Sequence, residues 1–189
     1  MFEVCGKHFG LKLMEALEIL GKRYDDQNSL RVHIEHAVLA AIGAMDTQLV
    51  IECIPLTEKN GQVSVNRSWL LPLLREGLKE STLEFFNSYV LKLASQCYDK
   101  WQFFKTNGQL NDAHIHELLC CQLWGLFPGF CRNPKDIENF KLVAKTLGLV
   151  LNNNADLRAP VLDGFKVTIR IFLKMKKLNL IIISTKGTP

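Results

Sequence analysis

The strongest constraint on the fold is a helical hydrophobic period that starts at Leu83 and ends at Phe104. Over about six turns, apolar residues follow one another in steps of three and four, at Leu83, Phe86, Val90, Leu93, Ala94, Cys97, Trp101 and Phe104. This spacing is typical of an amphipathic helix that buries one face. Ser81 with Glu84 three residues later predicts a capping box at the start, and TNG at residues 106–108 predicts the end. The sequence therefore predicts one long helix here.

Similar periods predict helices along most of the chain. Leu13, Leu17 and Leu20 share one helical face, and further helices are predicted over residues 29–45, 48–54, 67–79, 112–127, 137–151 and 155–166. The connecting segments are short and rich in Asn, Gly, Asp and Pro, and no pair of alternating strands flanks a two-residue turn before Phe165. The predicted class is all-α.

Such helices can close into a bundle or stack as helical hairpins in a solenoid. Pro72, inside the predicted helix 67–79, is expected to bend that helix, as helices in HEAT-type repeats often bend. No seam of fixed length runs through all the helices, as a bundle would require. With 189 residues and 48% hydrophobic content, the chain can bury one sizeable core. We predict an α-solenoid of HEAT-like antiparallel hairpins over residues 1–165.

The C-terminal residues follow a different pattern. Apolar side chains from Val167 to Met175 alternate with other residues, several of them basic, and six Lys or Arg but no Asp or Glu follow Asp163. A period near two does not suit a helix, and the chain offers no partner strand. We therefore predict that residues 166–189 form a poorly packed or disordered basic tail outside the fold.

Composition points to a soluble intracellular protein without contact with a membrane. The longest apolar run, residues 37–45, is well short of the roughly 18 residues that a membrane span needs.

The six cysteines fall mostly inside helical patterns, which favours reduced, buried thiols over disulfides. They are Cys5, Cys53, Cys97, Cys120, Cys121 and Cys131.

Two histidine clusters were considered as metal sites. The sequence HIHELLCC brings together residue types that bind zinc: His114, His116, Glu117, Cys120 and Cys121. On a helix, however, His114 and His116 lie about 200° apart and cannot face one ion. The pair His33 and His36, with Glu35 beside it, is better explained as part of a helix surface. We expect no metal or other cofactor, and keep a small metalloenzyme built on His116, Glu117 and Cys120 only as a third hypothesis.

Catalytic motifs are equally scarce. Cys131, beside Arg132 and just before a predicted helix, is the one cysteine in a setting that could lower a thiol pKa, but packing at a helix corner explains it better. The sequence has no glycine-rich phosphate loop, nucleophile elbow or carboxylate pair. We predict that the chain is not an enzyme.

Basic residues near predicted helix ends are candidate contacts to RNA phosphates. In a stacked helical array such residues can line one edge, which would bind phosphate without reading sequence. Acidic neighbours such as Glu76 and Glu138 also allow a simpler explanation, that these are solvated helix ends. The candidates are Arg67, Arg75, Lys79, Arg132, Lys135 and Lys141.

The stretch QLWGLFPGFCRNPKD, residues 122–136, predicts a corner between two helices. Pro128 and Gly129 are expected to end the first helix. Asn133 is the predicted N-cap of the next helix, with Pro134 at its first position and Asp136 in its first turn.

Several of these stretches, in this order, resemble the ribosomal RNA processing protein 12 family. They are RSWLLPLLREG (67–77), LEFFNSYVLKLA (83–94), QLWGLFPGFCRNPKD (122–136), FKLVAKTLG (140–148) and DLR (156–158), and the resemblance covers residues 30–165. It implies a HEAT-repeat scaffold without catalysis, located in the nucleus and nucleolus. It also implies a role in ribosomal RNA maturation and in the export of subunit precursors. The implied partners are pre-ribosomal particles, precursor ribosomal RNA, assembly factors and a Ran-type GTPase.

The chain would then be a fragment or short form of a longer solenoid. The alternative is a generic helical adaptor that binds protein partners through an exposed apolar groove.

Overall fold

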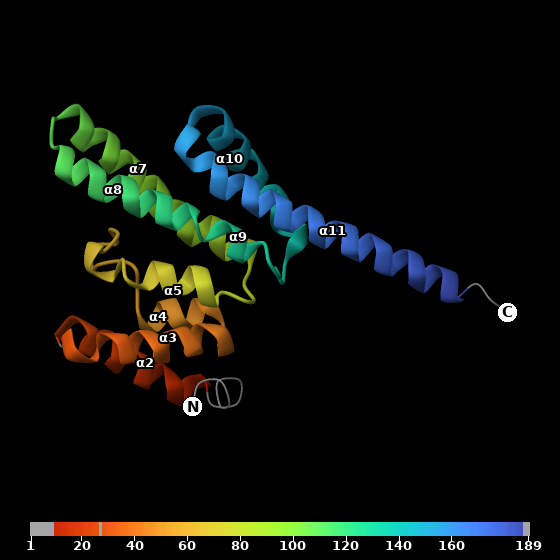
Figure 1. The fold of residues 1–189 in the computed structure, drawn as a ribbon, viewed down its shortest axis with the longest axis horizontal. Helices are drawn as coiled ribbons and strands as arrows, with labels where there is room; N and C mark the ends of the chain where they lie inside the picture. The colour runs from red at the N-terminus through yellow and green to blue at the C-terminus, as the bar shows by residue number, and fades with distance from the viewer. Residues whose placement is uncertain (1–9, 27, 187–189) are drawn as a thin grey trace.

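The computed structural model describes residues 10–26 and 28–186, with side chains over 13–26 and 29–174, and these residues form an all-α fold as predicted (Figure 1). The first layers contain α2 (Gly10–Asp26), α3 (Arg31–Ala44), α4 (Thr47–Cys53) and α5 (Leu70–Gly77). Helix α2 packs against α3 and α4, and α3 packs against α5. Leu13 and Leu17 of the predicted face are buried, so the hydrophobic period identified the buried side of α2.

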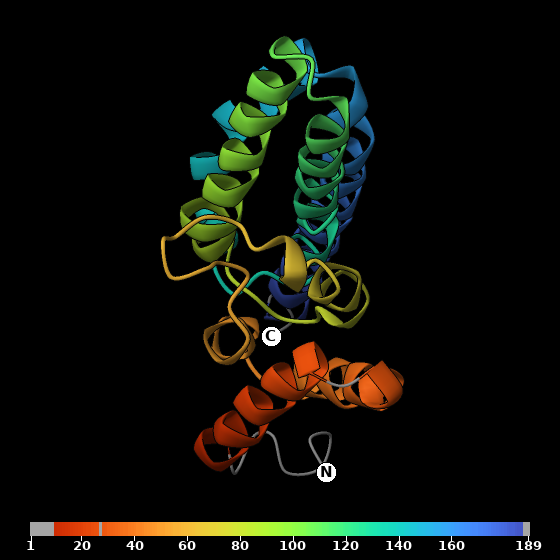
Figure 2. The same cartoon turned by 90° about the vertical axis from the view of Figure 1, so that its left-hand side faces the viewer.

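The predicted long helix is confirmed. It consists of α6 (Leu83–Phe85), a π-helical turn (Phe86–Val90) and α7 (Leu91–Thr106), which follow one another without a break. Helix α8 (Leu110–Trp124) returns beside α7, and Figure 2 shows the two side by side. The capping-box prediction is wrong, because Thr82 is the N-cap residue and its hydroxyl accepts a hydrogen bond from the Phe85 N–H (3.2 Å).

The centre of the core is an aromatic cluster around Phe86. Its ring lies 5.1 Å from Phe127 and 5.1 Å from Phe130, and 6.3 Å from Trp124, measured between ring centroids. All four side chains are buried. Aromatic pairs at such distances add to the stabilisation from buried area. The apolar residues of the 122–136 stretch therefore belong to the core, where they join the helix that starts at Leu83.

Pro128 and Gly129 do not end a helix. They lie inside the short helix α9 (Phe127–Phe130), which follows α8 after one turn. Asn133 is not an N-cap and Pro134 does not begin a helix, because the next turn, a 3-10 helix, starts at Ile137 with Asp136 as its N-cap. Pro134 instead forms a parallel bridge with Ser81, whose carbonyl accepts a hydrogen bond from the Lys135 N–H (3.0 Å).

Asp136 bonds to the start of a different helix. Its Oδ1 accepts a hydrogen bond from the Leu83 N–H (2.6 Å) and its Oδ2 one from the Glu84 N–H (2.9 Å), while Asn139 Nδ2 donates to Oδ2 (3.1 Å). A carboxylate at a helix N-terminus satisfies free backbone donors and favours the helix dipole. We call residues 81–84 together with residues 131–136 the Asp136 corner.

The expectation that the pattern after Phe165 does not suit a helix is wrong. Helix α10 (Phe140–Asn153) is followed by α11 (Arg158–Lys186), which packs against α9 and α10. Val161, Gly164 and Thr168, at helical spacing, form its buried face, and the Thr168 hydroxyl donates to the Gly164 carbonyl (2.9 Å). Two of these three residues are not large apolar residues, so the hydrophobic pattern did not show this face.

The later turns of α11 extend away from the other helices (Figure 1). Ile169 and Leu173 are exposed, which agrees with the expectation of a poorly packed end. The division of the chain at residue 165 stays a prediction, and residues 187–189 lie outside the described residues.

Two further expectations concern helix bending and membranes. Pro72 is the third residue of α5, in the first turn, where the absence of its N–H removes no hydrogen bond from the helix. The expected cause of a bend is therefore missing from this helix, and the bend itself stays a prediction. Within residues 10–26 and 28–186, no helix is both long enough and apolar enough to span a bilayer.

Candidate binding pocket

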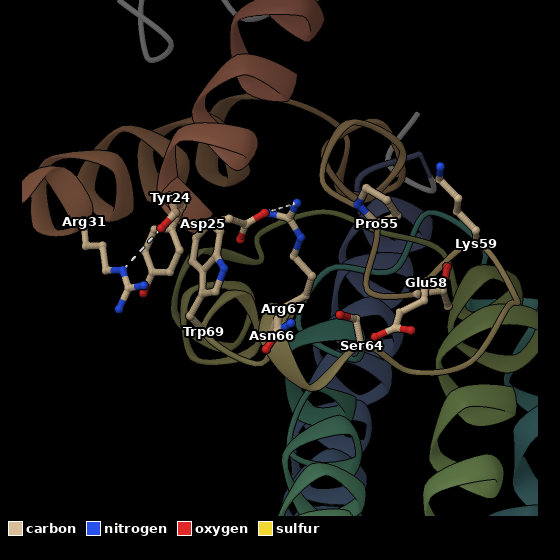
Figure 3. A pocket seen from close by; sticks show the side chains of 11 residues that line it. Tyr24, Asp25, Arg31, Pro55, Glu58, Lys59, Ser64, Asn66, Arg67 and Trp69 are labelled. Carbon is tan, nitrogen blue, oxygen red and sulfur yellow. Dashed lines mark hydrogen bonds and ion pairs between the residues drawn. The ribbon is translucent and has the colours of Figure 1, made fainter. Parts of the chain in front are cut away.

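A surface pocket of about 770 Å³ lies where the end of α2, the start of α3 and the connection from α4 to α5 meet (Figure 3). Its size falls in the range of pockets that hold small ligands, roughly 300–1,000 Å³. It is lined by Tyr24, Asp25, Arg31, Pro55, Thr57, Glu58, Lys59, Ser64, Asn66, Arg67 and Trp69. We call it the Tyr24–Trp69 pocket.

Tyr24 and Trp69 stack along one wall of the pocket, and Arg31 lies over the Tyr24 ring. The rings of Tyr24 and Trp69 are nearly parallel, with centroids 3.8 Å apart and an interplanar angle of 16°. The Arg31 guanidinium carbon lies 5.0 Å from the Tyr24 ring centroid, within range of a cation–π contact. Arg31 Nε also donates a hydrogen bond to the Tyr24 carbonyl (3.3 Å). The column Arg31, Tyr24 and Trp69 is therefore held by contacts among its own members.

Tyr24 is fixed by its hydroxyl group as well. The phenol O–H donates to Glu35 Oε1 (2.8 Å) on α3. Burial raises the pKa of Tyr24 to about 12, and the hydrogen bond to the Glu35 carboxylate adds to this rise. Tyr24 is therefore neutral and a hydrogen-bond donor at physiological pH.

Arg67 joins the start of α5 to the end of α2. Its Nη1 donates to the Gly21 carbonyl (2.8 Å), its Nη2 lies 2.8 Å from Asp25 Oδ2, and its side chain is 18% exposed. A part-buried arginine with two partners of this kind fixes the geometry of the wall. The sequence suggested Arg67 as a phosphate contact, and this role stays a prediction.

Trp69 carries an unsatisfied donor. Its Nε1 is buried and has no hydrogen-bond partner in the described part of the chain. In Figure 3 this nitrogen lies on the side of the indole that faces Asp25 and Arg67. A buried tryptophan N–H normally finds a partner, so this atom is an exception at the wall of the pocket.

The opposite rim is a short hairpin-like loop. Thr57 and Val63 form an antiparallel bridge, the Glu58 N–H donates to the Gln62 carbonyl (2.8 Å), and Gly61 has a positive φ of 76°. Only glycine adopts such a conformation without strain. Glu58 and Lys59 are exposed on this loop, so their charged groups lie in solvent at the rim opposite Tyr24 and Trp69.

The other predicted phosphate contacts lie elsewhere. Arg132 Nη1 donates to the Leu78 carbonyl (3.4 Å), and the Lys135 N–H donates to the Ser81 carbonyl (3.0 Å). Both residues therefore lie beside the connection that follows α5 and includes Lys79. The Lys135 Nζ lies 2.9 Å from Asp46 Oδ2. The hydrogen bond to Asp46 raises the pKa of Lys135. Arg67 lies before the other end of α5, so the structure separates it from these three residues. Arg75 and Lys141 are exposed on α5 and α10.

The histidine and cysteine candidates do not form one site. Within the described residues, no three His, Cys, Asp or Glu side chains are arranged to hold a metal ion. His116 Nδ1 lies 2.9 Å from the Asp112 carbonyl, while Cys120 is buried and its thiol donates to the Ala94 carbonyl (3.6 Å). Cys131 is also buried, and burial raises its pKa to about 11. Cys5 lies outside the described residues.

Sequence reasoning missed Tyr24, Arg31 and Trp69. Tyr24 follows the predicted helical face of Leu13, Leu17 and Leu20 and belongs to no motif, whereas Trp69 lies far along the chain, in the predicted helix 67–79 and in the stretch RSWLLPLLREG. The one available signal was the place of Trp69 in RSWLLPLLREG, a stretch that carries the family resemblance. It gives no information about a partner on α2.

The paired helices define the class of protein as an all-α helical-repeat protein. The family described as "Ribosomal RNA-processing protein 12, HEAT repeats" matches residues 1–185. The chain therefore belongs to this family. The match is wider than residues 30–165, to which the sequence resemblance extended.

Individual relatives agree with this assignment. The chain is 48% identical over 164 residues to "RRP12-like protein" of Drosophila melanogaster, and the match covers 87% of this chain and 12% of that protein. It is 36% identical over 172 residues to "RRP12-like protein" of Gallus gallus, in a match that covers 89% of this chain and 13% of that protein. It is 27% identical over 165 residues to "Ribosomal RNA-processing protein 12" of Saccharomyces cerevisiae, in a match that covers 85% of this chain and 13% of that protein. The chain thus spans about an eighth of the length of these relatives.

Proposed function

We propose that this chain is a HEAT-repeat segment of a non-catalytic scaffold in ribosome biogenesis, which acts in the maturation of ribosomal RNA and in the nuclear export of pre-ribosomal subunits. The observation that carries the proposal is the family match over residues 1–185. The name of the yeast relative refers to ribosomal RNA processing. The proposed location is the nucleus and nucleolus.

The architecture supports a binding role. Helical pairs that stack in one direction leave long edges and inter-helix connections open to partners. In this chain the Tyr24–Trp69 pocket lies at such a connection. The proposed partners are pre-ribosomal particles, precursor ribosomal RNA, assembly factors and a Ran-type GTPase.

The state of the thiols supports a role without catalysis. Burial raises the pKa of Cys97 to about 11, of Cys120 to about 12 and of Cys131 to about 11. A catalytic cysteine needs the opposite shift, because the thiolate is the nucleophile. These cysteines are part of the core.

Affinity purification of the tagged chain from nuclear extract, with and without ribonuclease, tests the proposal. We expect recovery of precursor ribosomal RNA and assembly factors, and the ribonuclease arm shows whether RNA or protein holds the chain to the particle. Absence of both from the purified material would contradict the proposal for this chain.

Charge-reversal variants sharpen the experiment. Replacing the exposed Arg75, Lys79 and Lys141 together by Glu is expected to reduce RNA recovery if these residues contact phosphates. The matched control replaces Lys92, Lys105 and Lys145, which are also exposed on helices, by Glu. Equal recovery with both variants would remove these three residues from the RNA contact.

The alternative function, a protein–protein adaptor, is favoured by one observation. Phe103 and Leu110, at the end of the α7–α8 pair, have 61% and 70% of their surface exposed. Large exposed apolar side chains that lie together often mark a protein interface. Partners retained in high salt and after ribonuclease treatment, without ribosome assembly factors among them, would favour this adaptor function.

A further inference from the structure

We infer that the Tyr24–Trp69 pocket binds a nucleotide of single-stranded RNA, with the base stacked against Trp69 and the phosphate beside the basic side chains of Arg31, Lys59 and Arg67. The inference rests on the proposed function for the choice of RNA as the biological ligand. The pocket itself supplies the chemical argument, which depends on its aromatic column, its excess of donors and its size.

The aromatic column is suited to a flat ligand. Tyr24 covers one face of Trp69, and the Arg31 guanidinium lies over the Tyr24 ring. Trp69 is half-buried and lines the pocket. A base that stacks on this indole extends the column, and such stacking tolerates any base because every base has a π face.

The hydrogen-bonding groups favour a ligand rich in acceptors. Arg31, Lys59, Arg67 and Trp69 can only donate, whereas only Asp25 and Glu58 on the lining are pure acceptors. Asp25 is already paired with Arg67. Arg67 uses Nη1 and Nη2 in its contacts with Gly21 and Asp25 and keeps further N–H groups. The Trp69 N–H has no partner in the described chain. Phosphate and base carbonyl oxygens would supply the missing acceptors.

Charge and shape argue against peptide ligands. A basic peptide would place its charge beside Arg31, Lys59 and Arg67. A peptide of Glu or Asp alone matches these charges but has no aromatic ring to continue the stack of Tyr24 and Trp69. A volume of about 770 Å³ also accommodates a base with its sugar and phosphate.

The test is direct binding of the purified chain to a fluorescein-labelled oligouridine of about ten nucleotides, measured by fluorescence anisotropy. We expect saturable binding that Trp69→Leu weakens about tenfold, because base stacking is lost. Trp69→Phe keeps an aromatic ring beside Tyr24 but removes the N–H and the second ring of the indole, and is expected to weaken binding about threefold. Lys59→Glu should weaken binding more than Lys145→Glu, which makes the same charge change on α10 outside the pocket.

Tryptophan emission gives a second readout. We expect the oligonucleotide to quench emission of the unmodified chain, and this quenching to be lost in Trp69→Phe. Thermal melting by circular dichroism identifies any variant that fails to fold.

Three results would overturn the inference. They are no binding of the oligonucleotide, equal binding by the unmodified chain and Trp69→Leu, and tighter binding of an oligoglutamate peptide with the same dependence on Trp69. The third would assign the pocket to acidic peptides. The proposed function fails separately, because recovery from nuclear extract can succeed through protein contacts when the pocket binds no RNA.

Discussion

The two ends of α5 lead into two polar sites of opposite character. Beyond its C-terminal end, the Asp136 corner encloses a carboxylate that is 9% exposed and accepts three hydrogen bonds. Before its N-terminal end, the Tyr24–Trp69 pocket is open and contains the unpartnered Trp69 N–H.

This difference distinguishes a site whose hydrogen bonds stabilise the fold from a site whose polar groups are open to a ligand. A closed site in which donors and acceptors match contributes to stability, because breaking it exposes unsatisfied buried groups. An open site with excess donors contributes less to stability and leaves groups available to a ligand. Substitutions at the corner should therefore affect unfolding most, and substitutions in the pocket should affect binding most.

The largest expected effect on stability is that of Asp136→Ala. It leaves the N–H groups of Leu83 and Glu84 without their partner, and we expect a loss of about 3 kcal/mol in the free energy of unfolding. Urea denaturation followed by circular dichroism measures this loss. Glu138→Ala, an exposed neighbour on the same segment, is the control and should change stability by less than about 0.5 kcal/mol. A loss below about 1 kcal/mol for Asp136→Ala would contradict the structural role of the corner.

The packing behind the corner is tested by two glycines. A Cβ at Gly164 would collide with the ring of Phe127, whereas a Cβ at Gly148 meets nothing. We expect Gly164→Ala to cost about 2 kcal/mol and Gly148→Ala, inside α10, to stabilise by about 0.5 kcal/mol. Thermal unfolding of the pair gives the sign of each effect. A stable Gly164→Ala variant would mean that α11 can move away from α9 at little cost.

On the pocket side, the largest loss of stability is expected for Arg67→Met. This change removes the hydrogen bond to Gly21 and the ion pair with Asp25, both 2.8 Å. The arginine is mostly buried, and we expect a cost of about 1 kcal/mol. The control is Arg75→Met, on the exposed side of α5. A cost as large as that of Asp136→Ala would show that the pocket is as important for stability as the corner.

Tyr24→Phe is expected to cost about 1 kcal/mol at neutral pH, through the lost hydrogen bond to Glu35. The pKa of Tyr24 is raised from 10.0 to about 12 in the folded chain. Folding therefore favours the neutral phenol, a contribution that is complete below pH 10 and lost as the pH rises towards 12. The difference between wild type and Tyr24→Phe should shrink over that range. A difference that stays constant would contradict the raised pKa.

The smallest effect is expected for Lys135→Met, because the side chain is 47% exposed and its ion pair with Asp46 is screened by water. We expect a loss of about 0.3 kcal/mol that decreases with added salt. The pKa of Lys135 is raised, so this contribution is complete at neutral pH and is lost only above the ordinary lysine pKa of about 10.4. A loss above about 1 kcal/mol would mean that the surface side of the corner is also closed.

Local patterns predicted the helices well but not their ends. Leu83, Phe86, Val90 and Leu93 are all buried, because a period of 3.6 reports directly on a buried helix face. The predicted capping box of that helix is wrong, because the free N–H groups of its first turn bond to Thr82 and to the distant Asp136. A cap that comes from another segment leaves no local signature.

The tail and the pocket show two other limits. In α11 the buried face contains Gly164 and Thr168, so close packing against α9, not hydrophobicity, determines it. In the pocket, Tyr24 and Trp69 become neighbours only through the packing around α2 and α5. Arg67 was singled out for its charge, although its contacts to Gly21 and Asp25 could not be read from spacing.

The Asp136 corner also has a consequence for the kinetics of folding. Its hydrogen bonds join residues 53 and 52 positions apart, with the α7–α8 pair in the intervening loop. Closing a long loop costs entropy, whereas the contacts of the α7–α8 pair are more local and can form earlier. Asp136→Ala should therefore accelerate unfolding and leave the folding rate almost unchanged. The corner determines how long the native state persists, not how quickly it is reached.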